Sequence, residues 1–249
     1  MAAKNRAVLT ERDLLVLNFL FEQRVANFEQ IANRFFPQTK VFNVYRRLTK
    51  LAKAKFIVKI GVQTEGFILN VYGLDESGLS AVSKGYKFSI TKPLYKSDSI
   101  LHDVALVDIR ERFRKTKMVV EYYTENVLQG CGNFLDNENF KSFVHLNSDA
   151  ALTIRTSSGQ HNVALEYEVS DKQKSRYEKK LTDYYFAPTI AGVFYICENP
   201  FIENLIKRVD VEVGAKSEPK VYTCLRQNLQ NENGSMVFTN RNNARFHWE

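Results

Sequence analysis

Three acidic side chains on two neighbouring apolar segments are the residues best suited to chemistry in this sequence. Asp149 lies in residues 147–155, and Glu166 and Glu168 lie in residues 161–170, beyond a short polar turn. The alternation of apolar side chains predicts two β-strands with the acids on their polar faces. Carboxylates this close repel one another unless a cation neutralises them. The pattern therefore predicts a site for a divalent metal ion, Mg²⁺ or Mn²⁺, which prefer oxygen ligands.

The alternative to a metal site is a half-exposed hairpin whose acids simply face water. The segment that follows, residues 171–187, favours the metal site because its spacing is helical and brings cations towards the strands. Its apolar side carries Tyr177, Leu181, Tyr184 and Tyr185. Lys174 lies within that arc and Lys180 on its edge, whereas Lys179 points away. A helix that packs its tyrosines on the sheet would bring Lys174 or Lys180 to the acids.

A metal held by carboxylates suits the hydrolysis of a phosphodiester bond. Asp149 and Glu166 would hold the ion, while Glu168 serves as a third ligand or as a base. Lys180, or failing it Lys174, would stabilise the negative charge that develops on phosphorus.

Three short motifs in this region resemble a known family. They are S-D-A-A-L at 148–152, L-E-Y-E-V at 165–169 and K-L-x-x-Y at 180–184. The arrangement of acids resembles restriction-endonuclease-like nucleases, and the three motifs together resemble the replication-relaxation family and its MobC class of plasmid relaxases. The resemblance implies a winged helix followed by a nuclease-like domain. Ser148 stands where a proline often precedes the first acid, and Glu168 where a lysine is usual, so which lysine takes part stays open.

A histidine and two tyrosines are further candidates for chemistry. His102 lies on the apolar strip of a long helix predicted over residues 99–114, where a core histidine is the ordinary interpretation. In the family that the sequence resembles, a histidine recurs near the start of this helix, which favours a role at the site. Tyr184 or Tyr185 is a conceivable nucleophile for a relaxase. Both also lie on the packing face of their helix, which favours a core role.

The N-terminal part of the chain has the pattern of a DNA-binding domain. Thr10 and Asn27 are N-cap residues for two helices, and a third helix opens at Thr39. Residues 56–60 and 67–74 follow as two strands, and this order is that of a winged helix-turn-helix. The predicted class is α+β, with the winged helix followed by an α/β restriction-endonuclease-like domain of the PD-(D/E)XK type.

The third helix is the predicted DNA reader. Its apolar face takes Val41, Val44, Tyr45, Leu48, Leu51 and Ala52. The other positions are cationic or carry amides, which suits phosphates and base edges in the major groove. They include Lys40, Asn43, Arg46, Arg47 and Lys50. The alternative is a solvated basic helix in a winged helix that binds protein.

The chain is expected to divide at a basic, proline-containing linker. Residues 1–83 would form the winged-helix domain, residues 84–98 the linker and residues 99–249 the nuclease-like domain. In the last of these, the order helix, three strands, helix, strand fits an α/β nuclease core. The tail, residues 240–249, is compatible with a flexible basic arm.

The composition is that of a basic globular protein. The formal net charge of +7 favours a polyanionic partner. Three cysteines without metal-ligand spacing argue for a reducing compartment and against a disulfide framework. No apolar run approaches the ~20 residues that span a bilayer, and residues 1–13 lack a signal-peptide core. We therefore expect a cytoplasmic protein without membrane insertion.

Together these features predict a plasmid mobilisation relaxase that binds the transfer origin and makes a metal-dependent single-strand nick in DNA. The resemblance implies that it acts with an accessory mobilisation protein and a coupling apparatus. The alternative is a non-catalytic winged-helix replication or transcription factor whose nuclease-like domain is degenerate. Metal binding separates the two, because a degenerate site should not be stabilised by Mn²⁺.

Overall fold

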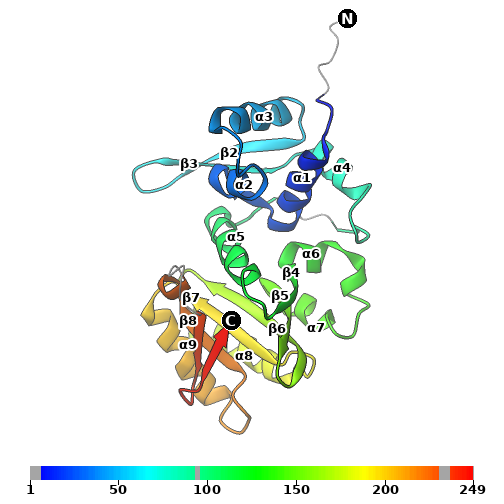
Figure 1. Cartoon of the computed structure of the whole chain (residues 1–249). Helices are drawn as coiled ribbons and strands as arrows, with labels where there is room; N and C mark the ends of the chain where they lie inside the picture. Colours follow the sequence, from blue (N-terminus) through cyan, green and yellow to red (C-terminus); the bar gives the residue numbers. More distant parts are fainter. Residues whose placement is uncertain (1–6, 93–95, 230–235, 249) are drawn as a thin grey trace, which may run out of the picture. The chain divides into compact units, whose positions relative to one another are not determined.

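A computed structural model describes residues 7–92, 96–229 and 236–248. The chain divides into two compact units, one of Met1–Asp108 with Gly130–Asn133 and the other of Ile109–Gln129 with Phe134–Glu249 (Figure 1). Part of the predicted linker, residues 93–95, lies outside the described residues. The predicted domain boundaries stay predictions.

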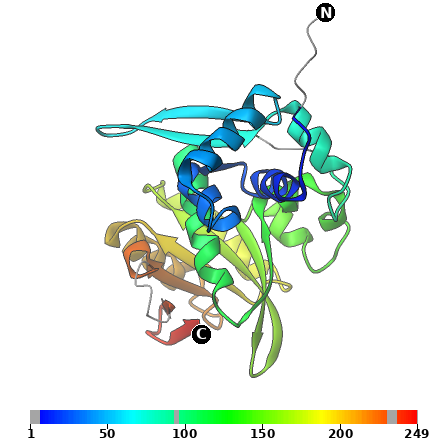
Figure 2. The same ribbon diagram turned by 45° about the horizontal axis from the view of Figure 1, so that its top comes forward.

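The first unit is built from helices around a small antiparallel sheet. Its first elements are α1 (Glu11–Gln23), β1 (Val25–Asn27), α2 (Phe28–Phe35), α3 (Val41–Lys53), β2 (Ile57–Gln63), β3 (Ile68–Leu74) and α4 (Glu76–Ser83). The strand order is β1-β3-β2. The β2–β3 hairpin is much longer than β1 and projects beyond the helices of this unit (Figure 2).

Side-chain caps start the first two helices at the predicted residues. Thr10 N–H donates to the Asp13 carboxylate at 2.7 Å, and the Asp13 N–H donates to Thr10 Oγ1 at 3.3 Å. Asn27 and Gln30 form the same reciprocal pair, with both hydrogen bonds at 2.9 Å. Each pair satisfies two N–H groups that the helix itself leaves without partners. Both predicted caps are confirmed.

The long helix α5 (Ile100–Arg114) is buried on more than one side, as its apolar residues all round predict. Val104, in its second turn, packs with Val25 and Val71 of the small sheet. Phe113, in its last turn, is fully buried in the second unit. The helix expected to open the nuclease-like domain therefore contributes residues to both units.

From α5 onward the chain alternates between strands and helices. The elements are β4 (Val119–Thr124), α6 (Glu125–Gly130), η1 (Gly132–Phe134), α7 (Lys141–His145), β5 (Ala150–Thr156), β6 (Gly159–Glu168), α8 (Lys174–Phe186), β7 (Gly192–Cys197), α9 (Pro200–Val213), β8 (Val221–Leu225), α10 (Arg226–Leu229), β9 (Met236–Asn240) and β10 (Arg245–Trp248). Within the described residues, the strands of the second unit form one seven-stranded sheet in the order β10-β9-β8-β7-β6-β5-β4. The three central strands β6, β7 and β8 run parallel, and the other neighbours are antiparallel.

Helices α8 and α9 cover the central strands. Parallel neighbours need a crossover connection, and α8 joins β6 to β7 while α9 joins β7 to β8. The two helices pack against each other on one side of the sheet (Figure 1). Residues 163–168 and 192–197 are buried throughout, so both faces of these stretches are covered. The expected alternation of a buried and a polar face is therefore wrong for β6, as is the alternative of a hairpin whose acids face water, because Glu166 and Glu168 are buried.

The C-terminal residues form a hairpin instead of a flexible arm. Strands β9 and β10 pair in antiparallel register, and Trp248 is 1% exposed. Its ring centroid lies 4.6 Å from that of Phe113 and 4.9 Å from that of Phe194. The interpretation of residues 240–248 as a mobile arm is therefore wrong, because aromatic packing holds them to the sheet. Among the described residues, no helix has the length and apolar composition to cross a bilayer.

Candidate functional site

The β5–β6 hairpin brings Asp149 and Glu166 to the same end of the sheet. Ala150 pairs with Leu165 in the antiparallel register. Asp149 precedes Ala150 and Glu166 follows Leu165, so the two acids stand opposite each other. The Asp149 carboxylate accepts a hydrogen bond from the backbone N–H of Tyr167 at 2.7 Å. This bond ties the first acid to the strand that carries the other two. The predicted pairing of these strands is confirmed by this register.

Lys180 is the cation that interacts electrostatically with all three acids. Its Nζ lies 2.5 Å from Oε2 of Glu166, whose side chain is 2% exposed. Burial lowers the pKa of Lys180, but the charges of Glu166, Asp149 and Glu168 outweigh burial and raise it overall. The structure leaves Lys179 exposed, so the predicted phase of this helix is right for both lysines. Because Lys180 already neutralises Glu166, repulsion among the acids does not by itself require a metal ion.

A buried tyrosine holds the other oxygen of Glu166. The Tyr184 hydroxyl donates to Glu166 Oε1 and lies 2.7 Å from the hydroxyl of Ser148. Burial and the Glu166 charge raise the pKa of Tyr184 well above its usual value, which opposes a role as nucleophile. The Tyr185 hydroxyl instead donates to Asp210 at 2.6 Å. The Tyr184 hydroxyl thus links Glu166 to Ser148, and the packing interpretation of both tyrosines fits their contacts.

Burial also acts on Glu166 itself. It raises the pKa of Glu166 to about 8; Lys180 opposes this rise and Asp149 adds to it. Tyr195 of β7 aligns with Glu166 in the parallel register, and its buried hydroxyl has no hydrogen-bond partner among the residues described. Sequence reasoning missed Tyr195, because it lies in a strand that reads as uniformly apolar. Only the pairing of β7 with β6 places Tyr195 beside Glu166.

Glu168 has a cation of its own. Lys172 Nζ lies 2.9 Å from Oε1 and 2.7 Å from Oε2 of Glu168, which is 2% exposed. Lys172 was not among the predicted site residues. Lys172 lies four residues after Glu168, in the connection between β6 and α8. The sequence does not show that this connection turns back towards Glu168, so the spacing alone does not reveal the contact.

The donor chemistry of the site suits a divalent cation, but the present side-chain positions do not form a ligand set. Asp149, Glu166 and Glu168 offer the carboxylate oxygens that Mg²⁺ and Mn²⁺ prefer. In the part of the chain that the structure describes, no three His, Cys, Asp or Glu side chains gather closely enough to hold a metal ion. Lys180 is 27% exposed, so it has room to turn towards solvent if a divalent ion replaces it beside Glu166.

One predicted catalytic residue, Lys174, is not brought to the acids, and another, His102, belongs to the other unit. Lys174 is exposed and makes ion pairs with Glu212 at 2.6 Å and with Glu178 at 3.4 Å. The expectation that it lies on the sheet-facing arc is wrong, because it stands at the first position of α8. His102 belongs to the first unit, and its Nδ1 lies 3.3 Å from the carboxylate of Asp103. Its catalytic role stays a prediction.

Helix α3 exposes four of the five predicted DNA-binding residues. They are Lys40, Asn43, Arg46 and Lys50. The helix buries a narrow stripe of Val44, Leu48 and Leu51. Val41 and Tyr45, expected on the apolar face, are instead 69% and 49% exposed. The stripe is too narrow to include them, because only side chains directly facing the unit reach its core.

Arg47 faces α1, not solvent. Its Nε donates to Asp13 Oδ1 at 2.8 Å, its Nη2 donates to Asp13 Oδ2, and the same nitrogen donates to the Val8 carbonyl at 2.9 Å. Burial raises the pKa of Asp13, but hydrogen bonds from Arg47 and Thr10 outweigh burial and lower it overall. The prediction that Arg47 points away from the core is therefore wrong. Its guanidinium stabilises the first unit.

Arg47→Ala should lower the stability of the protein by about 2 kcal/mol at neutral pH, because it strands the Asp13 charge. The loss is smaller than for a fully buried pair, since Arg47 is 22% exposed. The pKa of Asp13 is depressed in the folded state from 3.8. The stabilisation is therefore present above that pH and lost as pH falls through the folded value. Urea unfolding at neutral and at acidic pH measures the difference, which should shrink in acid.

The exposed Arg46 provides the control, because Arg46→Ala removes the same charge from the same helix without stranding an acid. Its stability should stay within about 0.5 kcal/mol of the wild type. If Arg47→Ala is as stable as Arg46→Ala at neutral pH, the ion pair with Asp13 does not form in solution.

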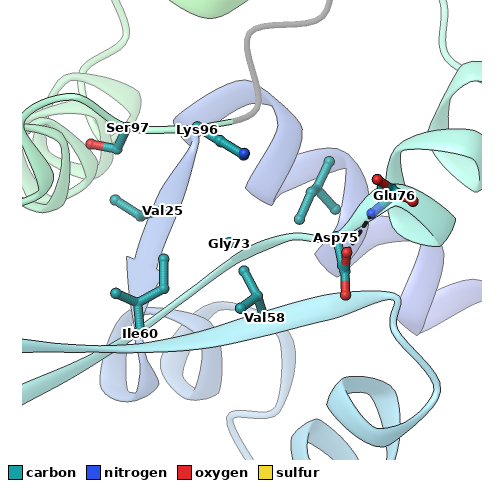
Figure 3. Close-up of a pocket in the computed structure, with 9 residues that line it drawn as sticks. Val25, Val58, Ile60, Gly73, Asp75, Glu76, Lys96 and Ser97 are labelled. Carbon is teal, nitrogen blue, oxygen red and sulfur yellow. Dashed lines mark hydrogen bonds between the residues drawn. The ribbon is translucent and has the colours of Figure 1, made fainter.

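A separate cavity of about 380 Å³ lies in the first unit against the small sheet (Figure 3). Its lining is Val25, Val58, Ile60, Gly73, Leu74, Asp75, Glu76, Lys96 and Ser97. The Asp75 carboxylate accepts a hydrogen bond from the N–H of Glu76 at 2.8 Å and so caps α4. The lining is otherwise largely apolar, and the cavity is not part of the carboxylate site.

Comparison with known proteins gives one result that covers most of the chain. The family model described as Replication-relaxation matches residues 17–188. That range contains both α3 and the hairpin with Asp149, Glu166 and Glu168. Searches of curated proteins and of solved structures found no match.

Proposed function

The chain belongs to the replication-relaxation family, and on this basis we propose that it binds plasmid DNA at the transfer origin and cuts one strand with the help of a divalent metal ion. Family membership indicates a role in plasmid replication or mobilisation. The observation that carries the proposed cleavage is the grouping of Asp149 with the buried Glu166 and Glu168 beside Lys180. Perturbed ionisable groups of this kind mark functional sites more often than chance.

Element order supports a restriction-endonuclease-like assignment for the second unit. The succession α5, β4, β5, β6, α8, β7, with short helices inserted after β4, is the helix, three strands, helix, strand expected of that core. The acids lie at the end of the β5–β6 hairpin, and the lysine comes from the helix that follows. In some restriction-endonuclease-like families the lysine also stands on this helix. The order and the positions of these residues are the support for the assignment.

We assign the first unit as a winged helix that contacts DNA. Its order α1, β1, α2, α3, β2, β3 places the basic helix α3 directly before the projecting hairpin. Lys40, Asn43, Arg46 and Lys50 are exposed on or beside α3, where they can reach phosphates and base edges. An accessory mobilisation protein and a coupling apparatus are the further partners that we propose from the family.

Each residue of the carboxylate site has a distinct role in the proposed reaction. Asp149 and Glu166 would hold the metal ion, with Glu168 as third ligand or base. When bound, the ion would polarise the scissile phosphate and lower the pKa of a bound water. Lys180 would leave Glu166 and stabilise the negative charge that develops on the phosphate. Tyr184 would keep Glu166 oriented through its hydroxyl, whose second partner is Ser148.

The ion pair between Lys180 and Glu166 favours a second candidate function. With Lys180 on Glu166 and Lys172 on Glu168, both buried acids already have cations. In a nuclease-like domain that no longer binds a metal ion, the two lysines would neutralise the buried acids and so stabilise the fold. The protein would then be a replication or transcription factor that binds DNA without cutting it.

Mn²⁺ separates the two candidates by its effect on stability. A ligand that binds only the folded state at 100 times its Kd stabilises that state by about 2.7 kcal/mol. For a protein of this size, the midpoint of thermal unfolding should rise by about 5–11 °C. We expect this rise for the wild type and its loss in Glu166→Gln, measured by differential scanning calorimetry in metal-free buffer with and without Mn²⁺.

A matched control comes from α8, the helix that carries Lys180. The Glu178 side chain is 42% exposed and pairs with Lys174, so Glu178→Gln removes one acid without touching the site and should keep the Mn²⁺ effect. A wild type that Mn²⁺ does not stabilise would support the degenerate domain. A Glu166→Gln variant that responds like the wild type would remove Glu166 from the metal site.

A further inference from the structure

Helix α3 exposes two aromatic rings one turn apart. Phe42 is 67% exposed and Tyr45 is 49% exposed, and both lie on the part of the helix that faces away from its buried stripe of Val44 and Leu48. Neighbouring exposed apolar side chains on a folded protein are characteristic of a surface that another molecule covers.

Each of these rings lies under a cation. The Arg46 guanidinium is 5.6 Å from the ring centroid of Phe42, and the Lys59 ammonium is 5.9 Å from that of Tyr45. Lys59 belongs to β2, so this contact makes α3 and β2 parts of one surface. Residues 40–60 contain no Asp or Glu. Besides Arg47, which is bound to Asp13, they contain Lys40, Arg46, Lys50, Lys53, Lys55 and Lys59. The charge of the surface is thus complementary to a polyanion.

The β2–β3 hairpin extends the same surface. Lys59, Gln63 and Ile68 share one face of the hairpin, because Gln63 pairs with Ile68 and Lys59 stands four residues before Gln63 on the same strand. Tyr72, which pairs with Lys59, is buried and does not add to this surface. Ile68 is 60% exposed. The other face, with Ile60 among its residues, packs on the core of the unit. Apolar and amide side chains therefore continue from α3 along the outward face of the hairpin.

The aromatic rings determine which form of DNA this surface fits. In an intact duplex the base faces are stacked on each other and only their edges are open to a protein. Cations alone are sufficient to bind the phosphates of a duplex. An aromatic ring stacks on a base only when that base is unpaired, and such stacking contributes about 1–3 kcal/mol per base. Rings interleaved with cations are the pattern that binds single strands.

We propose that Phe42 and Tyr45 of α3, together with Arg46 and Lys59, form a site for unpaired bases, so that the first unit binds locally melted DNA more tightly than intact duplex. The inference rests on the proposed DNA-binding function and specifies the DNA structure that is recognised. The rings stack on bases of the opened strand, and the cations above them contact its phosphates. A protein that nicks one strand would in this way hold the strand that has left the duplex.

Fluorescence anisotropy with the full-length protein tests the inference. Three probes of the same length and sequence are compared at one salt concentration: a duplex, the same duplex with a central run of mismatches, and the single strand. The wild type should bind the mismatched duplex about tenfold or more tightly than the intact one. The double variant Phe42→Ala with Tyr45→Ala should bind both duplexes equally, with affinity for the intact duplex unchanged.

Two single variants identify the cause of any loss. Arg46→Ala should weaken binding to all three probes, because its contacts are to phosphates present in each. Phe201→Ala removes a ring that is 64% exposed on α9 of the second unit and should change nothing. Circular dichroism shows whether each variant folds, and these side chains are exposed enough that we expect all to do so.

The outcomes separate the inference from the function on which it rests. Equal wild-type affinity for the intact and mismatched duplexes overturns the inference but leaves duplex binding standing. An equal loss on both duplexes in the double variant also overturns it, since the rings would then contact base edges such as thymine methyl groups. No binding to any probe overturns the inference and the proposed DNA binding together.

Discussion

Glu166→Gln and Asp149→Asn should each abolish strand cleavage while DNA binding by the first unit stays intact. Each substitution keeps the size of the side chain and removes a negative charge that the proposed metal ion needs. Losing one ligand costs on the order of 4 kcal/mol of transition-state stabilisation, or about a thousandfold in rate. The measurement is the rate at which supercoiled plasmid becomes open circular in the presence of Mg²⁺.

The control for this result must separate lost chemistry from lost structure. Glu166→Gln frees Lys180 from its partner, and Asp149→Asn changes the hydrogen bond to Tyr167. Urea unfolding of both variants should therefore accompany the rates. Glu178→Gln, which replaces a half-exposed acid of α8, is the control. Cleavage at the wild-type rate in both folded variants would exclude these carboxylates from the mechanism.

Trp248→Ala should lower the free energy of unfolding by about 3–5 kcal/mol, the usual loss for a large aromatic side chain removed from a core. Trp248 is 1% exposed and contacts Phe113, Phe194 and Phe238 edge-on or at a steep angle. The substitution leaves a void where α5, β7 and β9 meet. Chemical denaturation of the wild type and the variant measures the loss.

The neighbouring His247 is the matched control, because it belongs to the same strand and is exposed. His247→Ala should change stability by about 0.5 kcal/mol or less. Comparable stability of Trp248→Ala and His247→Ala would show that the C-terminal strand does not pack on the sheet. If Trp248→Ala is as destabilising as expected, deletion of the last residues should unfold the second unit. Deletion of a flexible arm would not.

Local signals in the sequence predicted much of the second unit. The hairpin with Asp149 and Glu166, the helix after it and the phase that separates Lys180 from Lys179 all follow from spacing of two or about four residues. The caps at Thr10 and Asn27 are equally local. These features depend on neighbours along the chain, which is why periodicity reveals them.

Features that depend on tertiary contacts could not be predicted in this way. Arg47 is bound by Asp13, which is 34 residues away. Helical spacing places Arg47 beside the buried stripe of α3, but it does not reveal the acid that binds it. Strand β1 (Val25–Asn27) is too short to show alternation. The burial of Glu166 follows from α8 covering a face that strand periodicity treats as polar. In each case a partner distant in sequence decides the outcome.

The number of carboxylate clusters bears on the product of the proposed reaction. In the described part of the chain we propose one metal site, formed by Asp149, Glu166 and Glu168 at the β5–β6 hairpin. One site cuts one phosphodiester bond at a time, and enzymes of this chemistry that break both strands generally bring two sites together. A single cluster therefore favours a nick, and negative supercoiling would help to open the duplex at the position of cleavage.

Incubation of the wild-type protein with supercoiled plasmid that carries its cognate origin, in the presence of Mg²⁺, tests the central claim most directly. The products are separated by agarose gel electrophoresis over time, with and without a chelator. We predict open circles as the first product, no linear DNA before them, and no cleavage when the metal is removed. Linear DNA as the first product, or supercoiled plasmid that stays intact although the protein binds it, would contradict the account.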